Sequence, residues 1–99
     1  MNKTIKLFSD SGHGWAEVSL SELKELNILD KITSYSYIFK NNAYLEEDCD
    51  LSTYIEALKE NNIDFEFEDN YQGDNSPIRN YASYNSEIAS ILKGDKNGL

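Results

Sequence analysis

Residues 63–68 alternate apolar and acidic side chains without a break, in the order Ile-Asp-Phe-Glu-Phe-Glu. Because successive side chains of a β-strand point to opposite faces, this pattern predicts a strand with one buried apolar face and one anionic face. The apolar face needs a covering layer, and a chain of 99 residues has room for a single hydrophobic core. We therefore predict one domain over residues 1–93 and a disordered tail over residues 94–99.

Further strands are indicated by alternating or β-rich runs between turn residues. They are predicted near residues 4–8, 15–18, 32–39 and 43–46. The first two flank a glycine-rich connection, and the last two are joined through the pair Asn41-Asn42, which favours the positive φ of a two-residue turn. Each pair of strands is therefore predicted to form a hairpin.

Capping residues mark the helices. Residues 19–22 read Ser-Leu-Ser-Glu and match a capping box, and Asn27 is a typical left-handed terminator. A second helix, capped by Asp50 or Ser52, is predicted over residues 51–61, and a last one, capped by Asn85 or Ser86, is predicted to end at Lys93. The order ββα, ββα, β predicts an α+β fold: a small, mostly antiparallel sheet of about five strands with two to three short helices.

Charge is distributed unevenly along the chain. The net charge is −9, and residues 41–75 hold eleven acidic side chains against Lys59 alone. Such a field repels nucleic acids and anionic membranes and attracts a basic protein surface, so we expect no direct binding to nucleic acid or membrane. No run approaches the roughly 18 apolar residues of a membrane span, and the first residues lack the apolar core of a secretory signal. The expected location is the cytoplasm.

The sequence Gly12-His13-Gly14-Trp15 lies at the predicted turn of the first hairpin. Glycine on both sides of a histidine lets the backbone approach a ligand closely or adopt a positive φ, and Trp15 could stack on a planar ring. The alternative is an ordinary hairpin turn with Trp15 in the core and His13 exposed, which the pattern slightly favours.

Residues 71–84 combine three tyrosines with asparagine, serine and Arg79, the only arginine of the chain. Tyrosine, serine and asparagine are typical of binding loops, and a guanidinium suits phosphate or carboxylate. Arg79 is therefore either an anion anchor or an ion-pair partner for Glu66 and Glu68. Tyrosines of this kind are more often half-buried in a sheet than exposed for stacking.

Four acidic residues surround Cys49 between residues 46 and 50. Clustered carboxylates suit magnesium or calcium, but the spacing does not match an EF-hand, and a solvated loop in which Asp50 caps the next helix is the simpler interpretation. The neighbouring carboxylates also disfavour a thiolate at Cys49, and a single cysteine cannot form an internal disulfide. We therefore predict no metal site, no cofactor and no catalytic residue.

Four stretches of the chain together resemble a family of small, uncharacterised bacteriophage-encoded proteins of similar length. They are Gly12–Trp15, Tyr35–Tyr37, Tyr44–Asp50 and Ser76–Tyr81, within a matching region of residues 4–84. The resemblance implies a phage protein acting in the cytoplasm of the host cell and supplies no activity, cofactor or catalytic residue. Short viral accessory proteins commonly bind host machinery, so the resemblance favours evasion of host defence.

Three functions are compatible with these features. We favour a non-enzymatic protein that binds and sequesters a small nucleotide-like signal or cofactor, with rings stacking on the base and Arg79 meeting the phosphates. The residues predicted to bind this ligand are His13, Trp15, Tyr35, Tyr37, Ser76, Arg79, Tyr81 and Tyr84.

The second function is an acidic inhibitor that imitates DNA in the nucleic-acid groove of a basic host defence enzyme, in the manner of anti-restriction or anti-CRISPR proteins. The third is a small hydrolase that uses His13. This function is disfavoured because His13 is the only histidine of the chain and no nucleophile motif accompanies it. The tyrosine-rich edges are also compatible with a homodimer. The acidic residues predicted to contact a basic partner are Glu46, Glu47, Asp48, Asp50, Glu66 and Glu68.

Overall fold

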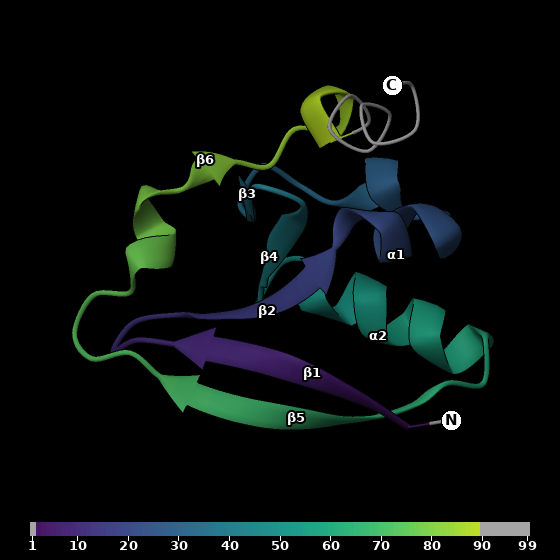
Figure 1. The fold of residues 1–99 in the computed structure, drawn as a ribbon, viewed down its shortest axis with the longest axis horizontal. Helices are drawn as coiled ribbons and strands as arrows, with labels where there is room; N and C mark the ends of the chain where they lie inside the picture. The colour runs from purple at the N-terminus through teal and green to yellow at the C-terminus, as the bar shows by residue number, and fades with distance from the viewer. Residues whose placement is uncertain (1, 90–99) are drawn as a thin grey trace.

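The computed structural model describes residues 2–89, which form a six-stranded sheet with helices packed against it (Figure 1). The strand order is β5-β1-β2-β4-β3-β6. The strands are β1 (Asn2–Ser9), β2 (Gly14–Ser19), β3 (Tyr37–Phe39), β4 (Asn42–Glu46), β5 (Asp64–Tyr71) and β6 (Ala82–Ser83). The helices are α1 (Leu20–Glu25), α2 (Leu51–Glu60) and the short 3-10 turns η1 (Leu29–Lys31) and η2 (Pro77–Asn80), and a third α-helix starts at residue 86.

The predicted α+β class is confirmed, but the sheet is mixed. Strand β5 pairs in parallel with β1, from Asn2 opposite Asp64 to Ser9 opposite Tyr71, whereas the other pairings among the described strands are antiparallel. Strand β4 runs in the same direction as β1, and α2 carries the chain back across the sheet before β5. A helical crossover joins strands that run in the same direction. For this reason β5 pairs with β1 in parallel and not as the second strand of a hairpin.

Strand β5 is longer and less buried than its alternating sequence predicts. It lies at the edge of the sheet, where Phe65 packs against the core but Phe67 remains 43% exposed. The prediction of one buried face is therefore only partly met, because an edge strand has a neighbour on one side only.

The predicted strand over residues 32–39 is wrong for its first five residues. Strand β3 contains only its last three residues, and a turn precedes it. The buried carboxylate of Asp50 accepts hydrogen bonds from the backbone N–H and hydroxyl of Thr33 and from the hydroxyl of Ser36. These bonds bend residues 33–36 into a turn. They also occupy the carboxylate of Asp50, which stands at the N-cap position of α2 without capping that helix through its side chain.

Two of the predicted turns hold residues with a positive φ. Asn27 ends α1 with a φ of 64°, as predicted. The turn between β3 and β4 lies one residue earlier than predicted: Lys40, with a φ of 56°, takes the left-handed conformation, and Asn42 already belongs to β4.

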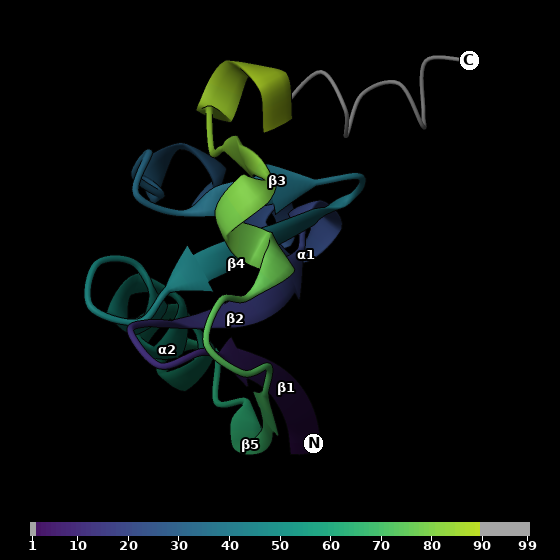
Figure 2. The same cartoon turned by 90° about the vertical axis from the view of Figure 1, so that its left-hand side faces the viewer.

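The sheet separates two apolar clusters. The larger one lies between the sheet and the helices, and its largest buried side chains include Ile5, Leu23, Leu45 and Leu58. Figure 2 shows the segment between β5 and β6 crossing in front of the strands, with α1 and α2 behind them. Under this segment lies a smaller cluster whose buried members are Trp15, Tyr44 and Ile78.

Within the part of the chain that the structure describes, no helix is both long enough and apolar enough to cross a membrane. The first turn of the predicted last helix is present, and the Asn85 side chain caps it by accepting hydrogen bonds from the backbone N–H groups of Glu87 and Ile88. The predicted tail over residues 94–99 lies outside the described residues.

Candidate ligand-binding site

The site is organised by Asp10, whose side chain is fully buried just after β1. Its carboxylate accepts hydrogen bonds from the backbone N–H groups of Gly12, His13 and Ser76, at 2.9, 3.0 and 2.8 Å. The guanidinium of Arg79 donates two more, from Nε at 2.5 Å and from Nη2 at 2.9 Å. These donors, the guanidinium first, hold the pKa of Asp10 well below its usual range. One carboxylate therefore joins the first hairpin turn to η2.

The partner of Arg79 is consequently Asp10, and not Glu66 or Glu68 as one of the sequence interpretations proposed. The hydrogen bond to Asp10 raises the pKa of the guanidinium. The guanidinium carbon also lies 5.5 Å from the centre of the Trp15 ring, within the range of a cation–π contact. Because its charge is matched by Asp10, Arg79 retains hydrogen-bond donors but brings no net positive charge to the site.

The two glycines beside His13 lie close to the ends of side chains from other parts of the chain. Among the described glycines only Gly73 has a positive φ. A Cβ at Gly12 would lie 2.8 Å from Nη2 of Arg79, and one at Gly14 would lie 2.8 Å from Oε1 of Glu47. The first of these contacts would push the guanidinium away from Asp10.

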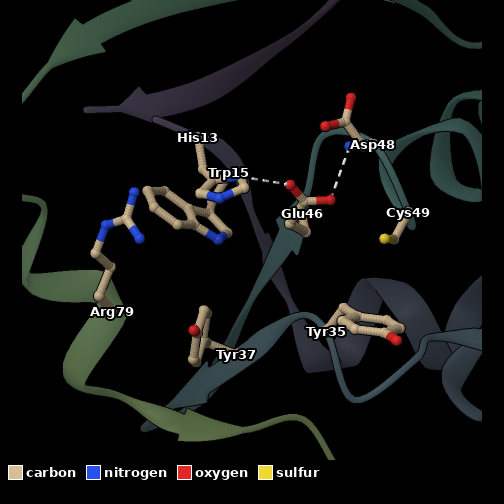
Figure 3. A pocket seen from close by; sticks show the side chains of 8 residues that line it. All are labelled: His13, Trp15, Tyr35, Tyr37, Glu46, Asp48, Cys49 and Arg79. Carbon is tan, nitrogen blue, oxygen red and sulfur yellow. Dashed lines mark hydrogen bonds and ion pairs between the residues drawn. The ribbon is translucent and has the colours of Figure 1, made fainter. Parts of the chain in front are cut away.

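A pocket of about 290 Å³ opens beside the hairpin turn (Figure 3). Rings from the hairpin turn, from β2 and β3, and from the turn before β3 surround it. The His13 and Trp15 ring centres are 6.0 Å apart, and those of Trp15 and Tyr37 are 6.3 Å apart with the rings nearly edge to face. Tyr35 stands at the rim with 70% of its surface exposed. The lining residues are His13, Trp15, Tyr35, Tyr37, Glu46, Asp48, Cys49 and Arg79.

The side of the pocket away from Arg79 is acidic. The Glu46 side chain is only 9% exposed, and its Oε2 lies 3.2 Å from Nδ1 of His13. Its Oε1 accepts a hydrogen bond from the backbone N–H of Asp48 at 2.8 Å. Cys49 follows, and burial, together with Glu46 and the flanking aspartates, raises the pKa of its thiol. This environment disfavours a thiolate nucleophile.

One polar atom of the pocket wall has no hydrogen-bond partner. It is Nε1 of Trp15, a residue only 1% exposed, and no acceptor for it occurs among residues 2–89. Figure 3 shows this nitrogen on the side of the indole that faces Tyr37 and the pocket. Buried donors are paired in the great majority of cases, so this unpaired N–H is a place where a ligand or a water molecule could accept a hydrogen bond.

Five of the eight residues predicted to bind a ligand meet at this pocket, and three do not. Ser76 is buried, caps η2 by accepting a hydrogen bond from the N–H of Ile78, and donates to Gln72. Tyr81 stacks on Phe39 at 4.4 Å and borders a separate, smaller hollow. Tyr84 is buried in the larger core, where its hydroxyl donates to the carbonyl of Leu29 and burial raises its pKa to about 12.

The six predicted partner-binding acids do not form one surface. Glu46 and Asp50 are buried and hydrogen-bonded inside the protein. Glu66 and Glu68 lie on β5, and strands β1 and β2 separate that strand from β4, a distance of roughly 14 Å at the usual strand spacing. Only Glu47 and Asp48 remain as exposed neighbours after β4.

The main residue missed by sequence reasoning is Asp10. Its signal was present, because an aspartate two residues before Gly12 is placed to accept a hydrogen bond from that backbone N–H. The pairing of Glu46 with His13 had no such signal, since 33 residues separate them.

Comparisons with protein-family models, curated proteins and solved structures find no match for this chain.

Proposed function

We propose that this chain is a non-catalytic protein that binds a small nucleotide-like molecule and withholds it from other proteins. The observation that carries the proposal is the convergence of four rings and an unpartnered indole N–H on one pocket. In the phage setting that the sequence resemblance suggests, withholding a host signal would serve counter-defence.

The pocket suits the base of such a ligand. Stacking of a base on an aromatic ring contributes about 1–3 kcal/mol, and Tyr35 and Tyr37 offer ring surface at the pocket. An amino group on the base edge can donate to Glu46 or Asp48, while a ring nitrogen or carbonyl can accept from Nε1 of Trp15. The volume of about 290 Å³ is at the small end for ligand sites, which favours one base and its sugar.

Charge decides where the phosphate can lie. Glu46 and Asp48 make one side of the pocket anionic, and Arg79 lies across the Trp15 ring from them in Figure 3. A phosphate is therefore favoured only at the Arg79 end, where the guanidinium can donate to it. Because Asp10 already matches the charge of Arg79, we expect nucleosides and monophosphates to bind better than triphosphates.

The test uses a panel of nucleosides, nucleoside mono-, di- and triphosphates and cyclic nucleotides. Binding is followed by thermal melting and by the fluorescence of Trp15, the only tryptophan of the chain. We expect at least one member to raise the melting temperature by about 2 °C or more at saturation and to change the fluorescence. No response to any member would contradict the proposal.

A matched pair of tyrosine variants places the ligand. Tyr35 and Tyr71 are 70% and 67% exposed, but only Tyr35 borders the pocket. Tyr35→Ala should weaken binding about tenfold or more through lost stacking, whereas Tyr71→Ala should leave it unchanged. Equal effects of the two substitutions would place the ligand elsewhere.

A further inference from the structure

We propose that His13, Glu46 and Asp48 form a binding site for a divalent transition-metal ion. Each residue offers one ligand atom, and the three atoms lie within 4.8 Å of one another. The proposal concerns the acidic side of the pocket and does not depend on nucleotide binding.

The donor set matches the chemistry of first-row divalent ions. Imidazole nitrogen together with carboxylate oxygen suits Zn²⁺, Mn²⁺ or Fe²⁺, whereas Mg²⁺ and Ca²⁺ prefer oxygen alone. Three protein ligands leave further coordination positions for water or a ligand. The imidazole distinguishes this set from the EF-hand-like site that the acidic run by itself fails to form.

Glu46 is already oriented for coordination. The backbone N–H of Asp48 holds Oε1, so that Oε2 is turned toward Nδ1 of His13 at 3.2 Å. An ion bound to both atoms would sit roughly 2.0–2.2 Å from each, in place of their present contact and with small side-chain shifts. The Glu46 side chain is only 9% exposed, and a divalent ion would compensate its buried negative charge.

The strands position the ligands before any ion arrives. Trp15 pairs with Glu46 across β2 and β4, and the backbone N–H of Glu47 donates to the carbonyl of Gly14 at 2.9 Å. The turn that carries His13 is thereby attached to the turn that carries Asp48. Ligands on paired strand ends are held more closely than ligands on free loops.

The unpartnered indole N–H is an observation independent of the acidic cluster. Trp15 lines the same pocket, and its buried Nε1, which Figure 3 draws on the side of the indole facing Tyr37, has no hydrogen-bond partner within residues 2–89. A water molecule or an anion bound to the ion could accept a hydrogen bond from this N–H. A bound ion would also reduce the negative charge of the pocket, which deepens the proposed function by allowing a phosphate to bind closer to Glu46.

The test titrates the full chain, free of nucleotide, with Zn²⁺ by calorimetry and with Co²⁺ by visible absorption. We expect one ion to bind per chain, and the visible absorption bands of bound Co²⁺ to be those of an ion with nitrogen and oxygen ligands. Mg²⁺ should bind at least about tenfold more weakly than Zn²⁺. Binding of no ion, or equal binding of Mg²⁺ and Zn²⁺, would overturn the proposal.

Matched variants separate ligation from general attraction of cations to acids. His13→Gln and Asp48→Asn remove one ligand each at exposed positions and should weaken Zn²⁺ binding about tenfold or more. Glu47→Gln removes the same charge at the neighbouring exposed residue and should leave the affinity within about twofold. If Glu47→Gln and Asp48→Asn weaken binding equally, no such site exists. Because no nucleotide is present, failure here leaves the proposed nucleotide binding untouched, and the converse also holds.

Discussion

At the scale of single residues, Asp10 is the side chain on which the pocket depends most. Its carboxylate receives donors from the hairpin turn, from the backbone before η2 and from Arg79. Removing that acceptor leaves Arg79 without its partner and leaves two backbone N–H groups of the turn unpaired. The wall formed by His13 and Trp15 would then lose its fixed position.

We therefore predict that Asp10→Asn lowers the melting temperature by at least about 5 °C, because breaking a buried, hydrogen-bonded ion pair is strongly destabilising. Asp74→Asn makes the same charge change at an exposed position of the adjacent loop and should shift it by less than about 2 °C. Differential scanning calorimetry provides the measurement. Equal shifts for the two variants would show that Asp10 has no special role.

The pH dependence of the same variant follows from the lowered pKa. Since the folded state depresses the pKa of Asp10, its contribution is fully present above the unfolded value, near pH 4, and decreases as the pH falls below it. The stability difference between the wild type and Asp10→Asn should thus be constant from pH 7 to about 5 and shrink by pH 3. Urea unfolding at these pH values measures it, and a difference that shrinks already between pH 7 and 5 would contradict this assignment.

At the scale of elements, the turn before β3 shows how one buried side chain overrides a strand pattern. The Ser36 hydroxyl donates to the Asp50 carboxylate at 2.5 Å and accepts from the backbone N–H of Glu46 at 2.9 Å. It therefore joins β3, β4 and the start of α2. An alternating sequence contains no information about an acceptor 14 residues away.

We expect Ser36→Ala to reduce the free energy of unfolding by about 1–3 kcal/mol, because a buried carboxylate and a buried N–H each lose a partner. Ser34→Ala is the control: it lies in the same turn and is exposed, and its hydroxyl makes no hydrogen bond within residues 2–89, so about 0.5 kcal/mol or less is expected. Chemical denaturation measures both. A loss below 0.5 kcal/mol for Ser36→Ala would show that another interaction holds the turn.

Elements defined by nearby residues were predictable, whereas those defined by distant partners were not. The cap at Ser19 and the terminator at Asn27 depend on their own neighbours, and both are present in α1. The direction of β5 depends on the crossover through α2 and on pairing with β1. The alternating sequence of β5 contains no information about either. The pocket follows the same division, because glycines beside His13 mark a close approach, while only the fold reveals that the approaching side chain is Arg79.

At the scale of the whole molecule, the two faces of the sheet are covered by different parts of the chain. The helices cover one face and enclose the larger core, while the segment from β5 to β6 covers part of the other (Figure 2) and contributes Arg79 to the pocket. This arrangement leaves the outer edge of β5 free within the described residues. Phe67 and Tyr71 are 43% and 67% exposed there.

A free edge with exposed aromatic residues tends to pair with another copy of the chain, and charged residues on the strand oppose this pairing. Glu66 and Glu68 are exposed on β5, and a second copy would bring the same charges into contact. We predict that the double variant Glu66→Gln with Glu68→Gln self-associates, and that the wild type does so increasingly when salt rises from about 50 to 500 mM and screens the repulsion.

Sedimentation velocity over a concentration series measures this association. The control carries Glu56→Gln with Glu60→Gln, which removes equal charge from exposed positions of α2 and leaves the charges of the edge strand unchanged. Its average mass should match that of the wild type at the same salt, because only charges on the edge strand oppose edge pairing. Equal association of both double variants would mean that the net charge of −9, and not its position on β5, keeps copies apart.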